Sequence, residues 1–486
     1  MDLQLLMIVT LIGLVVSILL GIHIGLALGL SAFFGTWAAF GAGFRPGYDV
    51  TPWLGQWSAF LTDWTKGLDR ALSMVGNTAF EQLRREVFAA IPLFVLMGDL
   101  VAKSGCARDL YNLINRALAV IPGRLAVATV IGNAVFSAVT GVSIASAAAF
   151  SRIAYPQMMH YGYKRSFALG SVAGSACLGM LIPPSILMII WGITIEESVG
   201  KLFLAGVLPG IILAGLFVLY SIISATLNPS VAPKVTEHLS GKLTLAELVS
   251  GFGIIALIMG ILGGIWAGFF TSFEAAGVGA LGALLLGVIK GMRWRGVADA
   301  VIDAAKTAAP LLILLLTAAM YSKFLTLSNI IPLIKDALIN TGLEGIGIIL
   351  MMVVIWLVLG MLLDSVSIIL LTLPLFWPIA QDMGTDPYVF AIFGILAIEA
   401  GLLTPPLGLL VYTVKGAVPD PTVKLGEIFK GSIPYWLLML VAMVLVWEFP
   451  VLATALHKKP VPRVEAPPVP VIQVEAAVPE WHLLRL

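Results

Sequence analysis

Two proline pairs interrupt long apolar runs of this chain and limit what it can fold into. Residues 178–185 (LGMLIPPS) interrupt the run 167–193, and residues 401–407 (GLLTPPL) interrupt the run 388–414. A proline inside a helix removes one backbone hydrogen bond and clashes with the preceding turn. Each run therefore predicts a helix that is unwound near its middle, with free carbonyl groups at the break.

The composition places these breaks in a membrane. The 486 residues are 59% hydrophobic and 11% charged, and a soluble domain cannot bury that much apolar surface. Free carbonyl groups at membrane depth are tolerated only inside protein or beside a watery cavity. The net charge of +1 gives no reason to expect a nucleic-acid partner. We expect a polytopic protein in a lipid bilayer, with the first apolar run, 3–20, retained as a helix.

The two halves of the chain repeat one plan. The proline pair at 183–184 recurs at 405–406, and Pro156 recurs as Pro378, all at one offset. Two further stretches match in the same order: AIPL at 90–93 with AAPL at 308–311, and GVLP at 206–209 with GSIP at 431–434.

Each half also contains a segment that cannot be one helix. Residues 345–379 carry Gly360 and Asp364 in the middle, and the arm before them would be ~22 Å long, short of the ~30 Å hydrocarbon core. A re-entrant hairpin with its tip near 360–365 fits better, and its first-half counterpart is 125–158 with a tip at 137–143. Two helices separate the halves, so the second half starts on the opposite face and the repeats are inverted.

The predicted fold class is an all-α polytopic membrane protein with inverted repeats, two re-entrant hairpins and two discontinuous helices. Lysine and arginine are more frequent in the loops that are cytoplasmic when the N-terminus is outside, which predicts a periplasmic N-terminus. The predicted segments are 1–87 (scaffold helices and an interfacial, tryptophan-bearing stretch from 41), 88–227 (first repeat, broken helix 167–193), 228–307 (connecting scaffold helices), 308–455 (second repeat, helix 310–325, broken helix 388–414 and last helix 433–451) and 456–486 (a disordered, proline-rich tail).

The polar residues at the tips and breaks predict two cation sites. Hydroxyl and carbonyl oxygens suit a hard monovalent ion such as Na⁺ better than a transition metal. The alternative is that these small residues only let helices pack closely. Sodium site 1 would use Ser137, Thr140, Gly141, Ser143, Gly179, Ile182 and Pro184, and sodium site 2 would use Gly360, Asp364, Gly401, Thr404 and Leu407.

Two carboxyl groups lie in apolar surroundings, where a charge is costly unless it is paired or wet. Asp364 is either an ion or proton ligand or the cap of a helix that begins after the break. Glu399 has the same two interpretations, and because it precedes the second break it could equally stay protonated; a structural role is favoured. Cys106 and Cys177 are interpreted as packing residues. Neither a Ser/His/Asp arrangement nor an HExxH or phosphate-loop motif occurs, so we expect no enzyme, no catalytic residue and no bound cofactor.

The sequence resembles the large membrane subunit of tripartite ATP-independent periplasmic (TRAP) transporters over residues 1–455. The similarity rests on residues 90–105, 135–149, 162–192, 360–379 and 400–416, which read AIPLFVLMGDLVAKSG, VFSAVTGVSIASAAA, GYKRSFALGSVAGSACLGMLIPPSILMIIWG, GMLLDSVSIILLTLPLFWPI and AGLLTPPLGLLVYTVKG.

The resemblance implies an elevator-type secondary transporter in the bacterial inner membrane. It implies sodium-driven import of a small carboxylate, such as a C4-dicarboxylate or sialic acid, with at least two sodium ions expected from the doubled site. A small four-helix membrane subunit and a periplasmic binding protein are the implied partners. The family's usual SGSS tip reads Thr140-Gly141-Val142-Ser143 here, so one hydroxyl is lost.

Two other functions stay open at this stage. One is a stand-alone sodium-coupled carrier of divalent anions that needs no binding protein. The other is a membrane scaffold or intramembrane enzyme that transports nothing, which leaves the doubled breaks unexplained. For a carrier, the substrate carboxylate would meet half-helix N-termini and tip amides. The substrate-binding candidates are Ser143, Ser185, Ser365 and Thr404, beside the helix-breaking prolines Pro183, Pro184, Pro405 and Pro406.

Overall fold

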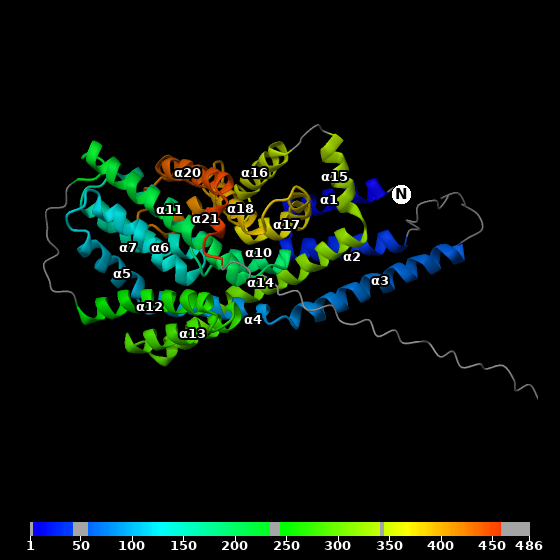
Figure 1. The fold of residues 1–486 in the computed structure, drawn as a ribbon, viewed down its shortest axis with the longest axis horizontal. Helices are drawn as coiled ribbons and strands as arrows, with labels where there is room; N and C mark the ends of the chain where they lie inside the picture. The colour runs from blue at the N-terminus through cyan, green and yellow to red at the C-terminus, as the bar shows by residue number, and fades with distance from the viewer. Residues whose placement is uncertain (1–2, 42–56, 234–243, 341–344, 458–486) are drawn as a thin grey trace, which may run out of the picture.

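The computed structural model describes residues 3–41, 57–233, 244–340 and 345–457 (Figure 1). Within those ranges every regular element is an α-helix. The helices are α1 (Leu3–Leu19), α2 (Ile24–Gly41), α3 (Trp57–Leu83), α4 (Val87–Lys103), α5 (Cys106–Ala117), α6 (Arg124–Thr140), α7 (Ser143–His160), α8 (Arg165–Ala176), α9 (Leu178–Leu181), α10 (Ile186–Ile195), α11 (Val199–Leu227), α12 (Leu245–Ala267), α13 (Ser272–Ile289), α14 (Trp294–Leu327), α15 (Ile330–Asn340), α16 (Ile346–Gly360), α17 (Ser365–Asp382), α18 (Pro387–Gly401), α19 (Leu409–Ala417), α20 (Leu425–Glu448) and α21 (Val451–Thr454).

Many of these helices are long enough to cross a membrane. By length and composition, eight described segments qualify, and α4 with α5, bent by 65°, makes a ninth if the pair is one span. The arms α6 and α16 fall below this length, as a re-entrant hairpin predicts, whereas α17 reaches it with 18 residues. The chain is therefore a multi-span membrane protein.

The first three helices form one group, at the right of Figure 1. The amphipathic helix α3 packs along α2 and also contacts α14. The indole Nε1 of Trp37 donates to the carbonyl oxygen of Trp64 at 3.1 Å, and the two rings are 5.2 Å apart. The interfacial stretch predicted from residue 41 thus contains a packed helix. Its residues 42–56, like the predicted tail at 458–486, lie outside the described ranges.

Two helices begin earlier than the sequence predicts. α14 starts at Trp294 instead of Pro310, because Ala300, Ala304 and Ala308 recur every four residues and bury one face of the added turns. The predicted segment boundary at 308 therefore falls inside a continuous helix. α20 starts at Leu425, eight residues before its expected first residue, where an acidic first turn caps it.

The hairpins and broken helices are present as predicted. Hairpin 1 is α6 and α7, joined at residues 141–142, and hairpin 2 is α16 and α17, joined at 361–364. The first discontinuous helix, α8 to α10, breaks at residues 182–185. The second, α18 to α19, breaks at 402–408.

The two repeats exchange contacts. The second part of each broken helix packs on the second arm of the other repeat's hairpin: α10 on α17, and α19 on α7. The helix after each broken helix packs on the first part of the other one: α11 on α18, and α20 on α8. Reciprocal packing of this kind is what two related repeats produce, and it confirms the predicted fold class.

A buried aromatic cluster fixes the second hairpin against both broken helices. Trp191 of α10, Trp356 of α16 and Phe390 of α18 have ring centroids 5.6 to 6.1 Å apart. The indole Nε1 of Trp356 donates to the hydroxyl of Thr372 on α17 at 2.9 Å. Edge-to-face and tilted aromatic contacts contribute stability beyond that from the apolar area they bury. These contacts therefore hold hairpin 2 against both broken helices.

Candidate ion and substrate site

The tip of hairpin 1 touches the first break. Gly141 ends α6 with a φ of 63°, in the left-handed region that favours glycine. Its carbonyl oxygen accepts a hydrogen bond from the N–H of Ile186 at 3.4 Å. A Cβ atom on Gly141 would lie 3.1 Å from the carbonyl oxygen of Pro184. The structure thus brings together two residues of predicted sodium site 1.

Hydroxyl groups line the same contact. A Cβ atom on Gly179 would lie 3.0 Å from the hydroxyl of Ser137 and 3.3 Å from the backbone nitrogen of Ser143. The Ser137 hydroxyl donates to the Ser146 hydroxyl at 2.6 Å, and the Thr140 hydroxyl lies 3.4 Å from Ser146. Sequence analysis missed Ser146, although it lies three residues after Ser143 and so shares its helix face.

The hydroxyl oxygen atoms at this contact are suitable ligands for a hard monovalent cation. Ser137, Thr140 and Ser143 are all buried, and the Ser143 hydroxyl forms no hydrogen bond within the described part of the chain. In the same ranges no three His, Cys, Asp or Glu side chains gather as a metal site would require. Oxygen-only donors of low charge are the environment in which Na⁺ is bound in preference to transition metals.

Two predicted residues of the first break are already engaged locally. The N–H of Ile182 donates to the carbonyl oxygen of Leu178 at 2.8 Å, which ends α9. The Ser185 hydroxyl donates to the carbonyl oxygen of Met180 at 2.7 Å and accepts from the N–H of Met188 at 3.5 Å. Ser185 therefore caps α10, and its contact with substrate stays a prediction.

The tip of hairpin 2 meets the second break through two glycines. A Cβ atom on Gly401 would lie 2.8 Å from the Cα atom of Gly360 and 3.0 Å from the carbonyl oxygen of Trp356. Real Cβ atoms essentially never come that close to backbone. Only glycine at both positions permits this approach, so the second predicted site also pairs a tip with a break.

Asp364 is the cap of α17. Its carboxylate accepts from the N–H of Ser367 at 3.1 Å and from the hydroxyl of the same residue at 2.5 Å. The capping interpretation that the sequence left open is thus observed. Whether Asp364 also binds an ion stays a prediction.

Thr404 is held by a residue that sequence analysis did not anticipate. Its hydroxyl donates to the carbonyl oxygen of Ala400 at 2.8 Å and accepts from the indole Nε1 of Trp436 at 3.1 Å. Trp436 belongs to α20, outside the repeat motifs, and no sequence signal places it here. Leu407, the last residue of predicted site 2, points outward with 42% of its surface exposed.

The two breaks differ in exposure. Pro183, Pro184 and Ser185 are buried, whereas Pro405 and Pro406 are exposed. Both proline–proline peptide bonds are cis. The tip of hairpin 1 covers its break, while the second break is open to the surroundings.

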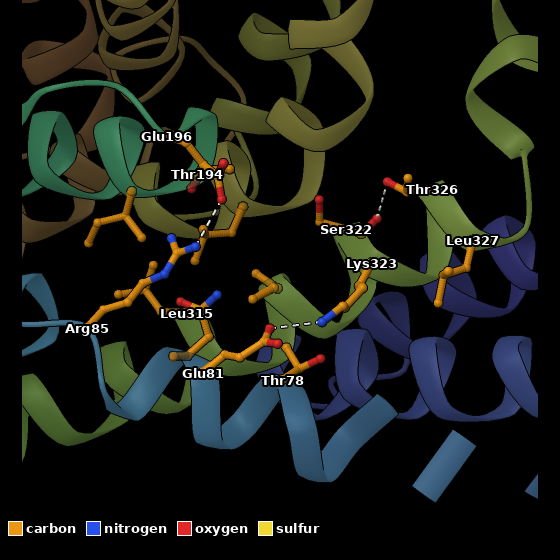
Figure 2. A pocket seen from close by; sticks show the side chains of 15 residues that line it. Thr78, Glu81, Arg85, Thr194, Glu196, Leu315, Ser322, Lys323, Thr326 and Leu327 are labelled. Carbon is orange, nitrogen blue, oxygen red and sulfur yellow. Dashed lines mark hydrogen bonds and ion pairs between the residues drawn. The ribbon is translucent and has the colours of Figure 1, made fainter. Parts of the chain in front are cut away.

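A cavity of about 370 Å³ lies apart from both contacts, between α3, α14 and the end of α10. Figure 2 shows two ion pairs in it, Arg85 with Glu196 at 2.9 Å and Lys323 with Glu81 at 2.9 Å. None of the predicted site residues lines this cavity. It marks a gap between the first helices and the broken-helix region.

The sequence matches the family described as "Tripartite ATP-independent periplasmic transporter, DctM component" over residues 7–452. The chain belongs to this family. It is 33% identical over 380 residues to the C4-dicarboxylate TRAP transporter large permease protein DctM of Pseudomonas aeruginosa, covering 78% of this chain and 87% of that protein. It is 30% identical over 381 residues to the ectoine TRAP transporter large permease protein TeaC of Halomonas elongata, covering 77% and 87%.

The fold of this TRAP large permease is similar to that of a solved transporter. The crystal structure of the Alcanivorax borkumensis YdaH transporter superposes with a TM-score of 0.61, at 16% identity, over 88% of this chain and 98% of that one. The family match and the relatives confirm the family resemblance read from the motifs, and the superposition supports the predicted fold. A TRAP large permease is a transporter subunit, not an enzyme, and membership implies a small membrane subunit and a periplasmic binding protein.

Proposed function

We propose that this chain is the permease of a sodium-coupled secondary transporter that imports an organic acid delivered by a periplasmic binding protein. The observation that carries the proposal is the doubled contact between a hairpin tip and a helix break, at Gly141 with Pro184 and at Gly360 with Gly401. The first contact joins the unwound residues 182–185 to the buried hydroxyl groups of hairpin 1, and the second joins the last residues of α16 and α18 next to the half-buried Thr404. The relatives named for C4-dicarboxylates and for ectoine support a small organic acid and leave its identity open.

Sodium would bind where the tips meet the breaks. In the first site the Ser137, Thr140 and Ser143 hydroxyls supply the oxygens, and in the second the Thr404 hydroxyl and neighbouring carbonyl groups do. A bound ion draws each tip onto its break and so completes the surface that the substrate recognises, which is a coupling free energy between two ligands. The substrate carboxylate then meets the N-terminus of α7, which no side chain caps and where backbone N–H groups and the helix dipole favour an anion.

The transport movement that fits this fold is an elevator. The hairpins and broken helices would move as one body across a scaffold made from α1 to α4 and α12 to α14. Two features support this. The cavity between α3, α14 and α10 lies at the boundary of the two bodies, and the pair Arg85–Glu196, which crosses that boundary, is an exposed contact that breaks at little cost. The second break is exposed while the first is covered, which supports a carrier whose substrate site is accessible from one side of the membrane at a time.

The deciding experiment is uptake into proteoliposomes that contain the permease with its small subunit. A panel of organic acids is tested with the binding protein, under an inward Na⁺ gradient and under an equal K⁺ gradient. We expect uptake of one acid class only with Na⁺ and only with the binding protein. Uptake without the binding protein would instead identify the stand-alone carrier. Equal uptake in Na⁺ and K⁺ would refute sodium coupling.

A further inference from the structure

The cavity between α3, α14 and α10 is lined by charges of both signs. Figure 2 shows Arg85, just after α3, paired with Glu196 at the end of α10, and Lys323 of α14 paired with Glu81 of α3. No other side chain is charged among the described residues that line the cavity. Each of the four keeps at least 39% of its side chain exposed, so the cavity is open to the surroundings.

The backbone positions one of these charges in an unusual way. Glu196 ends α10 with a φ of 59°, in the left-handed region, and within the described ranges only one other non-glycine residue has a positive φ. Glycine is the usual residue at such a helix end because it carries no Cβ atom. Side chains held in a strained conformation of this kind cluster at functional sites. The strained residue here supplies the carboxylate that faces Arg85.

The cavity lies beside the parts of the chain that are proposed to carry the substrate. Leu370 of α17 lines it and comes five residues after Ser365, the first residue of that helix. At ~1.5 Å per residue, this places it ~7.5 Å along α17 from the tip of hairpin 2. Ile193 and Thr194 line the cavity from α10, which follows the first break. One wall therefore belongs to the body that would move, and the wall of α3 and α14 belongs to the scaffold.

The volume suits a small soluble molecule. Ligand pockets in proteins have volumes of about 300–1,000 Å³, and this cavity has about 370 Å³. Because a water molecule takes ~30 Å³ of the liquid, the space corresponds to about twelve water molecules. It can therefore hold a ligand of roughly ten non-hydrogen atoms, whereas of a phospholipid only the headgroup would enter.

The balance of charges favours a zwitterion over an anion. A ligand carboxylate that pairs with Arg85 displaces Glu196, and an ammonium group on the same ligand supplies the glutamate with a new partner. The original pairs are exposed, so exchanging them costs little. A dicarboxylate that bound both Arg85 and Lys323 would leave two glutamates unpaired beside it. Repulsion between these like charges acts against a dianion.

We propose that this cavity is an entry site for the transported molecule, and that this molecule is a small zwitterion with a carboxylate and a positively charged nitrogen. The inference rests on the proposed transport function and narrows its organic acid to this class. The ligand carboxylate binds Arg85, and the ligand nitrogen binds Glu196. Movement of the body that carries Glu196 separates these two groups and releases the ligand.

The test compares two four-carbon probes that differ at one end. 4-Aminobutyrate carries a carboxylate and an ammonium group, whereas succinate carries two carboxylates. Saturation-transfer difference NMR measures the affinity of each probe for the full-length permease with its small subunit, in phosphatidylglycerol nanodiscs. The buffer contains K⁺ and no Na⁺, so the tip sites that are proposed to need Na⁺ do not contribute. We expect saturable binding of 4-aminobutyrate and binding of succinate that is weaker by about 5-fold or more.

Two variants and a control assign the binding to these charges. Glu196→Gln removes the partner of the ammonium group and should weaken 4-aminobutyrate binding by about 5-fold. The double variant Glu81→Gln/Glu196→Gln leaves Arg85 and Lys323 unpaired, so it should bind succinate more tightly than 4-aminobutyrate. The control is Glu86→Gln, which removes an exposed glutamate that does not line the cavity. It should leave both affinities unchanged.

Three results would overturn the proposal: no binding of 4-aminobutyrate, equal binding of the two probes to the wild type, or an unchanged preference in the double variant. If the double variant does not fold, the wild type and Glu196→Gln decide. Loss of 4-aminobutyrate binding when phosphatidylethanolamine is added to the nanodiscs would assign the cavity to a lipid headgroup and would also overturn the entry site. Failure of the proposed function is recognised separately, because it abolishes Na⁺-dependent uptake into proteoliposomes and leaves this binding in K⁺ unchanged.

Discussion

Gly401→Ala tests the contact between the second tip and the second break. The added Cβ atom would lie 2.8 Å from the Cα atom of Gly360 and 3.0 Å from the carbonyl oxygen of Trp356. Both are backbone atoms, so the tip must move away as a unit. Overpacking of this kind costs about 1–3 kcal/mol. The cost destabilises the state in which the tip of hairpin 2 contacts the second break, which is the state proposed to bind Na⁺. The apparent Na⁺ affinity should therefore weaken by about 5-fold to about 150-fold.

The assay is the Na⁺ concentration that half-maximally raises the thermal unfolding midpoint of the purified permease. Gly416→Ala is the matched control: it lies in α19, on the same discontinuous helix, with open space where its Cβ would be. There alanine should be neutral or stabilising by up to about 1 kcal/mol. The reasoning is refuted if Gly401→Ala folds and keeps the Na⁺ midpoint of Gly416→Ala.

Three further substitutions probe the tips and breaks. Thr404→Val leaves the indole N–H of Trp436 without its acceptor, at a cost of about 1 kcal/mol. It should weaken the Na⁺ dependence of uptake, whereas Thr404→Ser should preserve it. Equal Na⁺ dependence in both variants would remove Thr404 from the site. Thr140→Val should likewise raise the Na⁺ concentration needed for half-maximal uptake without lowering expression, and an unchanged value would argue for a packing role. Replacing Pro405 and Pro406 with Ala lets helix form across the break, so uptake should slow, and full activity would show that the break is dispensable.

The sequence predicts the parts of this fold that are set by local rules. Proline pairs determine where α9 and α18 end, and glycine with a polar tip determines where hairpin 1 turns, because these effects act within a few residues. The sequence also predicts that each hairpin tip contacts the break of its own repeat, because the proline pairs at 183–184 and 405–406 show that the two halves repeat one plan. The same offset relates Ser143 to Ser365 and Cys177 to Glu399.

What the sequence does not predict depends on contacts between distant segments. Trp436 reaches Thr404 only because α20 crosses the second break. The hydrogen bond from the Ser365 hydroxyl to Glu399, at 2.7 Å, requires α17 to pack on α18, which no local pattern encodes. The early start of α14 at Trp294 was missed for a related reason: its buried alanine face is too weakly apolar to be recognised before its neighbours are known.

The most direct measurement is binding of radioactive ²²Na⁺ to the purified permease, with K⁺ as the competing control ion. If each tip-to-break contact holds one ion, binding saturates at two ions per chain. In Gly401→Ala one of the two ions should bind only at about 5-fold to about 150-fold higher Na⁺ concentration. Binding that is absent, unsaturable or equally displaced by K⁺ would contradict the assignment of the tip-to-break contacts as sodium sites.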